Sequence, residues 1–171
     1  PTYVPAHLLL ANAYAGNRQL AEAKRELERV LAVDPDSDEA LYYLGLIDLE
    51  LNLPEEAKKL FSRLIAKGRD EPGGHYGLGI ALAAEGNNQS AIQEFQVAAK
   101  LRPGYHGVYY RLGNAQAKLR LYDDAIASYK RELQNGDDYD TWVALANAYQ
   151  EKGQSDKSAE ALREAEQLKK K

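Results

Sequence analysis

The sequence contains no cysteine and no methionine among its 171 residues, and it has a single tryptophan. Without thiols the chain can form neither a disulfide scaffold nor a cysteine-based metal or redox site. This absence leaves the cellular compartment open, with a cytoplasmic location favoured over a periplasmic one. Hydrophobic residues make up 44% of the chain, which is enough for the packed core of one or two domains.

Long hydrophobic runs are also missing. No stretch approaches the roughly 18 consecutive apolar residues that a membrane helix needs, and the mean hydropathy is −0.57, so we expect no membrane insertion. The first ten residues lack a basic segment followed by a long apolar run, which is the pattern of a signal peptide. Because the chain begins with Pro1 rather than Met, we expect it to be a fragment of a longer protein.

Positive charge is not in excess. Lys and Arg total 22 against 26 Asp and Glu, which gives a formal net charge of −4. Nucleic-acid binding draws most of its affinity from cations set against phosphates. The charge balance therefore argues against a nucleic-acid partner.

What the sequence does contain is a repeat with a period of 34 residues. Columns of small or bulky side chains keep this interval through successive repeats, and a fifth repeat follows one residue early. Chance does not align several independent columns in this way. The columns are Leu10, Leu44, Leu78 and Leu112; Gly45, Gly79 and Gly113; Ala23, Ala57, Ala91 and Ala125; and Leu27, Phe61, Phe95 and Tyr129, with Leu145, Ala146, Ser158 and Leu162 in the fifth repeat.

These columns define five repeats, each with two stretches of helical periodicity. Turn-forming residues separate the stretches, and no alternating β pattern is present. We therefore expect an all-α chain of ten helices, paired as antiparallel hairpins and stacked, since a single hairpin cannot bury both its faces. The repeats cover residues 4–37, 38–71, 72–105, 106–138 and 139–171.

Side-chain size gives the columns a physical role. Glycine and alanine let two helix backbones approach closely, and the bulky column, Leu162 included, is expected to fill the space between successive repeats. The glycine-rich stretch 73–79 has no preceding strand and no Lys-Ser/Thr pair, so it is a poor match to a phosphate-binding loop. Interior glycines weaken a helix, and we expect this one to begin late, near residue 74 or 75.

The columns resemble the tetratricopeptide repeat (TPR) family, whose unit has 34 residues with small or aromatic residues at set positions and a proline near its end. The resemblance covers residues 4–171 and implies a right-handed solenoid of helix hairpins, with residues 1–171 forming one domain. His7 and His75 depart from the pattern, because they occupy a position where the family favours Trp. The matching positions are Leu-Gly at 44–45, 78–79 and 112–113, the alanine column, Tyr14, Tyr149, Pro35 and Pro103.

The resemblance also implies where a ligand binds. In this family the first helices of the repeats line a concave groove that holds a peptide or partner protein. Tyrosines would form a ladder along the groove, although tyrosine is common at this position in the family and a framework role is the alternative. Asparagines in adjacent repeats could pair with the backbone amides of an extended peptide, although asparagine too is frequent there. The predicted groove residues are Asn12, Tyr42, Leu46, Tyr76, Ile80, Tyr110, Arg111, Asn114 and Asn147.

One subfamily pattern is missing. Chaperone-binding TPR domains grip a C-terminal carboxylate with Lys, Asn and Arg side chains from three repeats. With Arg111 aligned to the final Arg, Tyr42, Leu46, Gly77 and Gly107 stand where the other four groups should be. A lone Arg cannot supply the convergent cations that a free carboxylate needs. We therefore expect no carboxylate-clamp chemistry.

No constellation of catalytic or metal-binding residues is recognisable, so we expect no enzyme activity and no cofactor. His7 and His75 lie 68 residues apart in equivalent positions and should not meet on one metal. The sequence predicts a protein–protein interaction scaffold. Two alternatives stay open: a regulatory or targeting portion of a larger enzyme or secretion-type protein, and a self-associating module. A monomer is favoured, with a homodimer possible through the N-terminal face, where Leu8, Leu9 and Leu10 have no polar cap.

Overall fold

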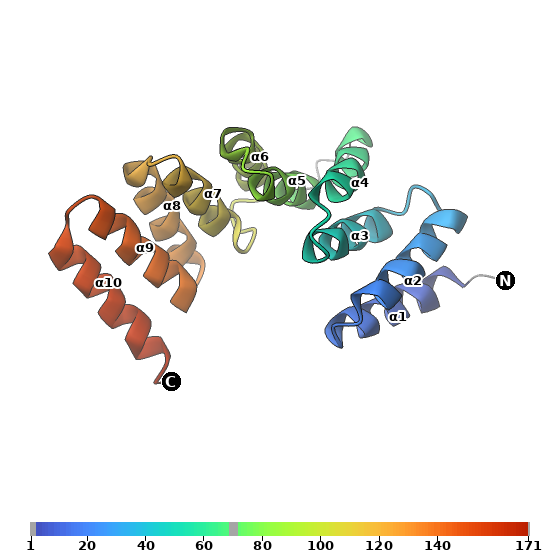
Figure 1. Cartoon of the computed structure of the whole chain (residues 1–171), viewed down its shortest axis with the longest axis horizontal. Helices are drawn as coiled ribbons and strands as arrows, with labels where there is room; N and C mark the ends of the chain where they lie inside the picture. The colour runs from blue at the N-terminus through green and yellow to red at the C-terminus, as the bar shows by residue number, and fades with distance from the viewer. Residues whose placement is uncertain (1–2, 69–71, 171) are drawn as a thin grey trace. The chain divides into compact units, whose positions relative to one another are not determined.

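The computed structural model describes residues 3–68 and 72–170, and within them the chain forms ten α-helices and no strand (Figure 1). The predicted fold class, an all-α solenoid of helix hairpins, is confirmed. The helices alternate with short turns along the whole described chain. Their bounds are α1 Val4–Gly16, α2 Leu20–Val33, α3 Asp38–Glu50, α4 Pro54–Ala66, α5 Pro72–Ala84, α6 Asn88–Leu101, α7 Val108–Lys118, α8 Tyr122–Asn135, α9 Tyr139–Glu151 and α10 Ser155–Leu168.

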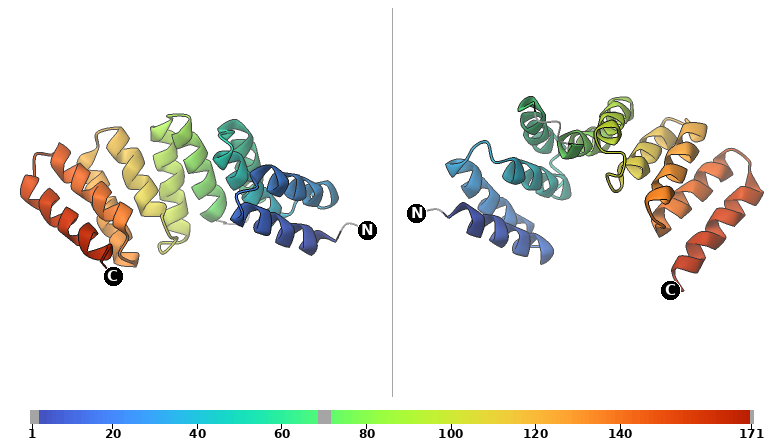
Figure 2. Two further views of the ribbon diagram at one scale, coloured as in Figure 1. Left: turned by 60° about the horizontal axis from the view of Figure 1, so that its bottom comes forward. Right: turned by 180° about the vertical axis from the view of Figure 1, so that it is seen from behind.

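The helices group into two compact halves, the N-terminal half Pro1–Glu85 and the C-terminal half Gly86–Lys171. In the N-terminal half α1 pairs with α2 and α3 with α4, while α2 packs on α3 and α4 on α5. In the C-terminal half α7 pairs with α8 and α9 with α10, while α6 packs on α7 and α8 on α9. Both views of Figure 2 show α9 and α10 side by side as an antiparallel hairpin. The prediction of one domain over residues 1–171 stays a prediction.

Local signals explain where the helices begin. Pro54 opens α4, where its missing N–H leaves no hydrogen bond unmade. Ser37 caps α3 by accepting a hydrogen bond from the Ala40 amide, and Asp138 caps α9 through the Thr141 amide at 2.8 Å. The prediction that the fifth helix begins near residue 74 is wrong, because α5 begins at Pro72.

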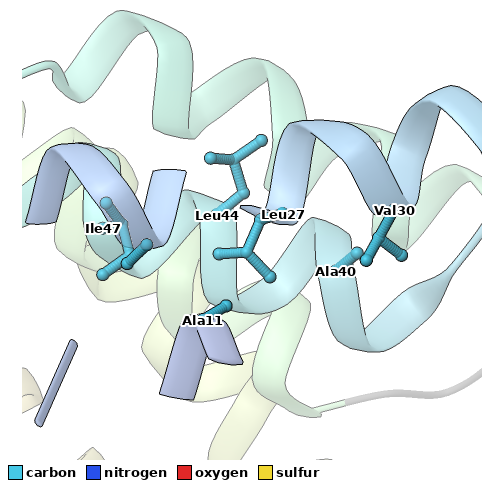
Figure 3. Packing of buried hydrophobic residues seen from close by; sticks show 7 residues of the cluster. Ala11, Leu27, Val30, Ala40, Leu44 and Ile47 are labelled. Atoms are coloured by element: carbon cyan, nitrogen blue, oxygen red, sulfur yellow. The ribbon is translucent and has the colours of Figure 1, made fainter. Parts of the chain in front are cut away.

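The core of each half follows the columns found in the sequence. Ala23, Ala57, Ala91 and Ala125 are all fully buried, and Leu27, Phe61, Phe95 and Tyr129 are at most 2% exposed. In the N-terminal half Leu27 and Val30 of α2 form one buried cluster with Ala11 of α1 and with Ala40 and Leu44 of α3 (Figure 3). Packing between neighbouring hairpins therefore rests on the alternation of small and bulky side chains.

Leu162 does not follow its column. We expected it to fill space between repeats, but it is 43% exposed. On α10 the small residues Ala161 and Ala165 are the buried ones instead. The reason is positional: the other bulky residues lie beneath the first helix of a following repeat, and no described helix follows α10.

Glycines let α3 and α5 approach the Phe61 ring. A Cβ atom added at Gly45 would lie 2.6 Å from Phe61 Cζ, and one added at Gly77 would lie 2.2 Å from Phe61 Cε1. In the C-terminal half Gly113 stands in the same way against Tyr129, at 2.5 Å. Gly77 belongs to the stretch that we expected only to weaken its helix, and its role here is close packing.

The turns inside the hairpins share one backbone conformation. A residue with positive φ recurs at the same position of every repeat, at Arg18, Asn52, Gly86, Arg120 and Gly153, with φ between 58° and 82°. Only two of the five are glycines, although the left-handed region favours glycine. No helix among the described residues has the length and hydropathy to cross a bilayer.

Candidate functional site

A pocket of about 390 Å³ lies between α7 and α9 in the C-terminal half, with α8 as its third wall. It brings together Asn114 and Asn147, the two asparagines predicted to hold a peptide backbone. Three alanines on α7 and α9 leave the space open, since larger side chains there would fill it. We call it the α7–α9 pocket, and its lining is Asn114, Ala117, Lys118, Tyr122, Tyr129, Ala144, Asn147, Ala148 and Glu151.

Asn114 is oriented by the residue behind it. The Tyr129 hydroxyl donates a hydrogen bond to Asn114 Oδ1 at 2.8 Å. Burial raises the pKa of Tyr129 far above its ordinary value, so the phenol keeps its proton and remains the donor. Among the described residues the Asn114 Nδ2 group has no hydrogen-bond partner, and it is the atom that can donate to a bound molecule.

Opposite charges flank the two asparagines. Lys118 closes α7 and Glu151 closes α9, at equivalent positions of the fourth and fifth repeats. The Tyr122 hydroxyl donates to Glu151 Oε2 at 3.0 Å and holds that carboxylate at the rim. Desolvation, together with the Glu151 charge, raises the pKa of Tyr122. The pocket lining thus combines two side-chain amides with one cation and one anion.

Other predicted groove residues of the C-terminal half lie outside this pocket lining. Tyr110 is half-buried, and its ring centroid lies 6.3 Å from that of Tyr129. Arg111 is exposed on α7. Tyr110 therefore packs against Tyr129, and its assignment to the binding groove stays a prediction.

In the N-terminal half the predicted residues spread over three helices. Tyr42 on α3 is half-buried, with its ring edge-on to Phe61 at 6.2 Å between centroids. Leu46 packs against the same cluster of Ala57, Phe61 and Ala81. Tyr76 and Ile80 are half-buried on α5, and Asn12 is exposed on α1. Their assignment to a binding groove stays a prediction.

Among the lining residues that sequence reasoning missed are those that carry a hydroxyl or a carboxylate, namely Tyr122, Tyr129 and Glu151. Tyr129 was recognised only as a bulky core residue, and nothing in the sequence ties its hydroxyl to Asn114. Glu151 shares its repeat position with Lys118, which was the available signal. No cluster of three His, Asp or Glu side chains suited to a metal occurs within residues 3–68 and 72–170.

Comparison with known families supports the repeat assignment. A family model described as a tetratricopeptide repeat matches residues 15–77. A second model with that description matches residues 106–131 and 139–171. Together the two models reach both halves of the chain, including α7, α8 and α9 around the pocket.

A curated relative matches most of the chain. The cytochrome c-type biogenesis protein CycH of Bradyrhizobium diazoefficiens is 29% identical over 157 residues, which cover 91% of this chain and 40% of CycH. The chain thus spans about two fifths of the length of this relative.

Solved structures share the fold. The thermophilic TPR protein TTC0263 of Thermus thermophilus is 27% identical, with a TM-score of 0.80 over 95% of this chain and 92% of that one. YrrB, described as a TPR protein with an unusual peptide-binding site, is 20% identical, with a TM-score of 0.71 over 96% of this chain and 85% of YrrB.

Proposed function

Because this chain belongs to the tetratricopeptide repeat family, we propose that it is a non-enzymatic interaction scaffold that holds an extended peptide segment of a partner protein in the α7–α9 pocket. The coarser part, a protein-interaction scaffold, follows from the family. The finer part, peptide binding at this pocket, rests on the convergence of Asn114 and Asn147. YrrB, which shares the fold, has a peptide-binding site of its own.

The chemistry of the pocket fits an extended backbone. An asparagine amide offers one acceptor and two donors, so it can pair with a peptide C=O or N–H without reading the side chain. Asn114 presents its nitrogen, because Tyr129 already occupies its oxygen, and Asn147 is exposed on the facing helix. Two such amides on neighbouring helices would hold one segment at two points.

The occupant we propose is an internal segment rather than a chain terminus. Lys118 is the one basic residue among those lining the α7–α9 pocket, and Glu151 offsets its charge. A free carboxylate would need several converging cations. An uncharged backbone has no such need.

A peptide-library experiment tests the proposal. Random heptapeptides blocked at both ends would be selected on the wild-type chain, and each hit titrated against Asn147→Ala. We expect about tenfold weaker binding, because one or two hydrogen bonds are lost. Gln93→Ala, an exposed amide on α6, serves as the matched control and should bind as wild type does. Equal affinity of Asn147→Ala for every hit would contradict the proposal.

The same hits resolve the role of the tyrosines. Tyr76→Ala removes a half-buried ring of the predicted ladder on α5. If the ladder contacts the peptide, affinity falls while the free energy of unfolding changes little. If the tyrosines have a framework role, Tyr76→Ala lowers the free energy of unfolding and the folded variant binds the hits with wild-type affinity.

A second candidate function, as part of a larger protein, is favoured by one observation: the match covers only 40% of the length of CycH. The scaffold would then be the regulatory or targeting portion of a larger enzyme or secretion-type protein. The full-length reading frame distinguishes the two, because a further catalytic or export segment would support this context. Peptide binding at the α7–α9 pocket is expected in either case.

A further inference from the structure

A second groove of about 490 Å³ lies away from the α7–α9 pocket, between α8 and α10 with α9 as its floor. It contains the one tryptophan of the chain, Trp142. We call it the tryptophan groove. Its lining is Lys130, Leu133, Gln134, Asp137, Trp142, Leu145, Tyr149, Lys157, Glu160, Ala161 and Glu164.

The repeat places an equivalent groove one step earlier, between α6 and α8 with α7 as its floor. Its volume is about 540 Å³. Lining residues of the two grooves correspond at the repeat interval of 34 residues, or 33 after the shortened fourth repeat. Corresponding pairs are Gln96 and Lys130, Ala99 and Leu133, Tyr109 and Trp142, Leu112 and Leu145, Ala127 and Glu160, Ser128 and Ala161, and Arg131 and Glu164.

In the earlier groove a guanidinium covers the aromatic ring. Arg131 Cζ lies 4.6 Å from the centroid of the Tyr109 ring, a cation–π contact. Tyr109 is only 5% exposed. In the groove between α6 and α8, an arginine of the chain itself therefore occupies the face of the aromatic ring.

The tryptophan groove lacks that arginine and carries the opposite charge in its place. Glu164 stands at the position of Arg131, and Trp142 is half-buried. The Trp142 indole N–H donates to Asp137 Oδ1 at 3.3 Å, which sets a second carboxylate beside the ring. An aromatic face with acidic neighbours attracts a cation, and tryptophan is the strongest aromatic partner for one.

The other end of the groove has the reverse polarity. Lys130 Nζ and Lys157 Nζ lie 5.8 and 5.6 Å from the centroid of the Tyr149 ring. Two lysines of the chain thus lie over the Tyr149 ring, whereas no cation of residues 3–68 and 72–170 lies over the Trp142 ring. The charge pattern makes the Trp142 end the place for an incoming positive group.

We propose that the tryptophan groove binds an arginine side chain presented by a segment of a partner protein. The guanidinium lies over Trp142, as Arg131 lies over Tyr109, and pairs with the Glu164 and Asp137 carboxylates. This site is separate from the α7–α9 pocket, and it gives the C-terminal half a second interaction surface.

Intrinsic fluorescence tests the proposal, because Trp142 is the sole tryptophan. Random 12-residue peptides blocked at both ends would be selected for binding to the wild-type chain. Peptides that also bind the Glu164→Arg variant would be discarded, because their binding does not depend on the Glu164 carboxylate. We expect arginine-containing hits that change Trp142 fluorescence saturably. Replacing the arginine of a hit by citrulline, which keeps the shape without the charge, should weaken binding about tenfold.

Variants of the chain complete the test. Glu164→Gln should weaken the hits about tenfold, while Glu166→Gln, an exposed carboxylate on the same helix, and Asn147→Ala, in the other pocket, should leave them unchanged. Glu164→Arg should shift Trp142 fluorescence without any peptide, because it copies the Arg131 contact. Glu164→Gln carries the test even if Glu164→Arg fails to fold. An absence of hits, equal binding of citrulline peptides, or wild-type affinity in Glu164→Gln would overturn the proposal.

Discussion

At the residue scale, the fold depends on pairs of one glycine and one large ring. Gly45 and Gly77 face the Phe61 ring from two helices, and Gly113 faces Tyr129. The Tyr129 ring also delivers the hydroxyl that orients Asn114. Gly113 therefore makes room for the Tyr129 ring in the core, and that ring in turn orients Asn114 in the α7–α9 pocket.

Gly77→Ala should destabilise the N-terminal half. The new Cβ would lie 2.2 Å from Phe61 Cε1 of a ring that is fully buried, so packing must shift at a cost of about 1–3 kcal/mol. Gly16→Ala is the matched control, because it meets nothing within 4 Å and should stabilise α1 by about 0.5–1 kcal/mol. Urea unfolding of both variants checks the signs, and a neutral Gly77→Ala would contradict the packing account.

Glu26 should make the N-terminal half sensitive to acid. The hydrogen bond with His7 at 2.5 Å, aided by the Arg29 charge, lowers the pKa of Glu26 below 4.5 despite its burial. A lowered folded-state pKa contributes stability above the unfolded value, and this contribution is lost as pH falls through the folded value.

The free energy of unfolding lost in Glu26→Gln should accordingly be largest above pH 4.5 and shrink as the pH falls below it. Chemical unfolding at stepped pH values measures this difference. Glu28→Gln, an exposed neighbour on α2, should show no such trend. A difference for Glu26→Gln that stays constant on acidification would contradict the assignment.

At the element scale, the repeat period predicts the helices well, because it records which faces must be buried. All ten helices occur among the described residues, and proline and capping side chains open several of them. Two predictions failed where neighbours outweigh local pattern. The α5 helix begins at Pro72 although the stretch is rich in glycine, because Gly77 packs closely against the Phe61 ring of α4. Leu162 is exposed because no described helix covers it.

The shared backbone conformation of the hairpin turns was not predicted, because three of the five positive-φ positions are not glycine. Arg18, Asn52 and Arg120 adopt the same positive φ as Gly86 and Gly153. A left-handed conformation costs a non-glycine residue roughly 1–2 kcal/mol. The repeat architecture holds these turns in place despite that cost.

Arg120→Gly should therefore stabilise the chain by about 1 kcal/mol, after the entropy of the more flexible unfolded glycine is subtracted. Thermal or urea unfolding of the variant measures the gain. Gly153→Ala is the reverse control: nothing lies within 4 Å of the added Cβ, so a loss of similar size would come from the backbone alone. Destabilisation by Arg120→Gly would contradict this reading of the turns.

At the scale of the whole molecule, the family and the interaction role follow from the sequence, while the composition of the site does not. Asn114 and Asn147 were predicted from their repeat positions, and the structure brings them to one pocket. The Tyr129–Asn114 and Tyr122–Glu151 hydrogen bonds join α8 to α7 and α9, and no periodic pattern encodes such cross-helix pairs. The arginine-binding potential of the tryptophan groove emerges only when two repeats are compared residue by residue.

We expect the chain to be a monomer despite the apolar surface of α1. Leu9 and Leu10 are 71% and 41% exposed, whereas Leu44, which occupies the position of Leu10 in the second repeat, is 5% exposed. Sedimentation should give one species from low to high micromolar concentration, and Leu9→Lys should sediment identically. A wild-type dimer that Leu9→Lys dissociates would instead identify this face as a homodimer interface.

The central claim is that the amides of the α7–α9 pocket hold a peptide backbone, and NMR of the side-chain amides tests it most directly. The 15N-labelled chain would be titrated with a library-selected heptapeptide while the NH₂ signals of Asn114, Asn147 and Gln93 are followed. The account predicts saturable shifts of the Asn114 and Asn147 signals at a common dissociation constant, with Gln93 unmoved. A peptide that binds while both asparagine signals stay in place would contradict it.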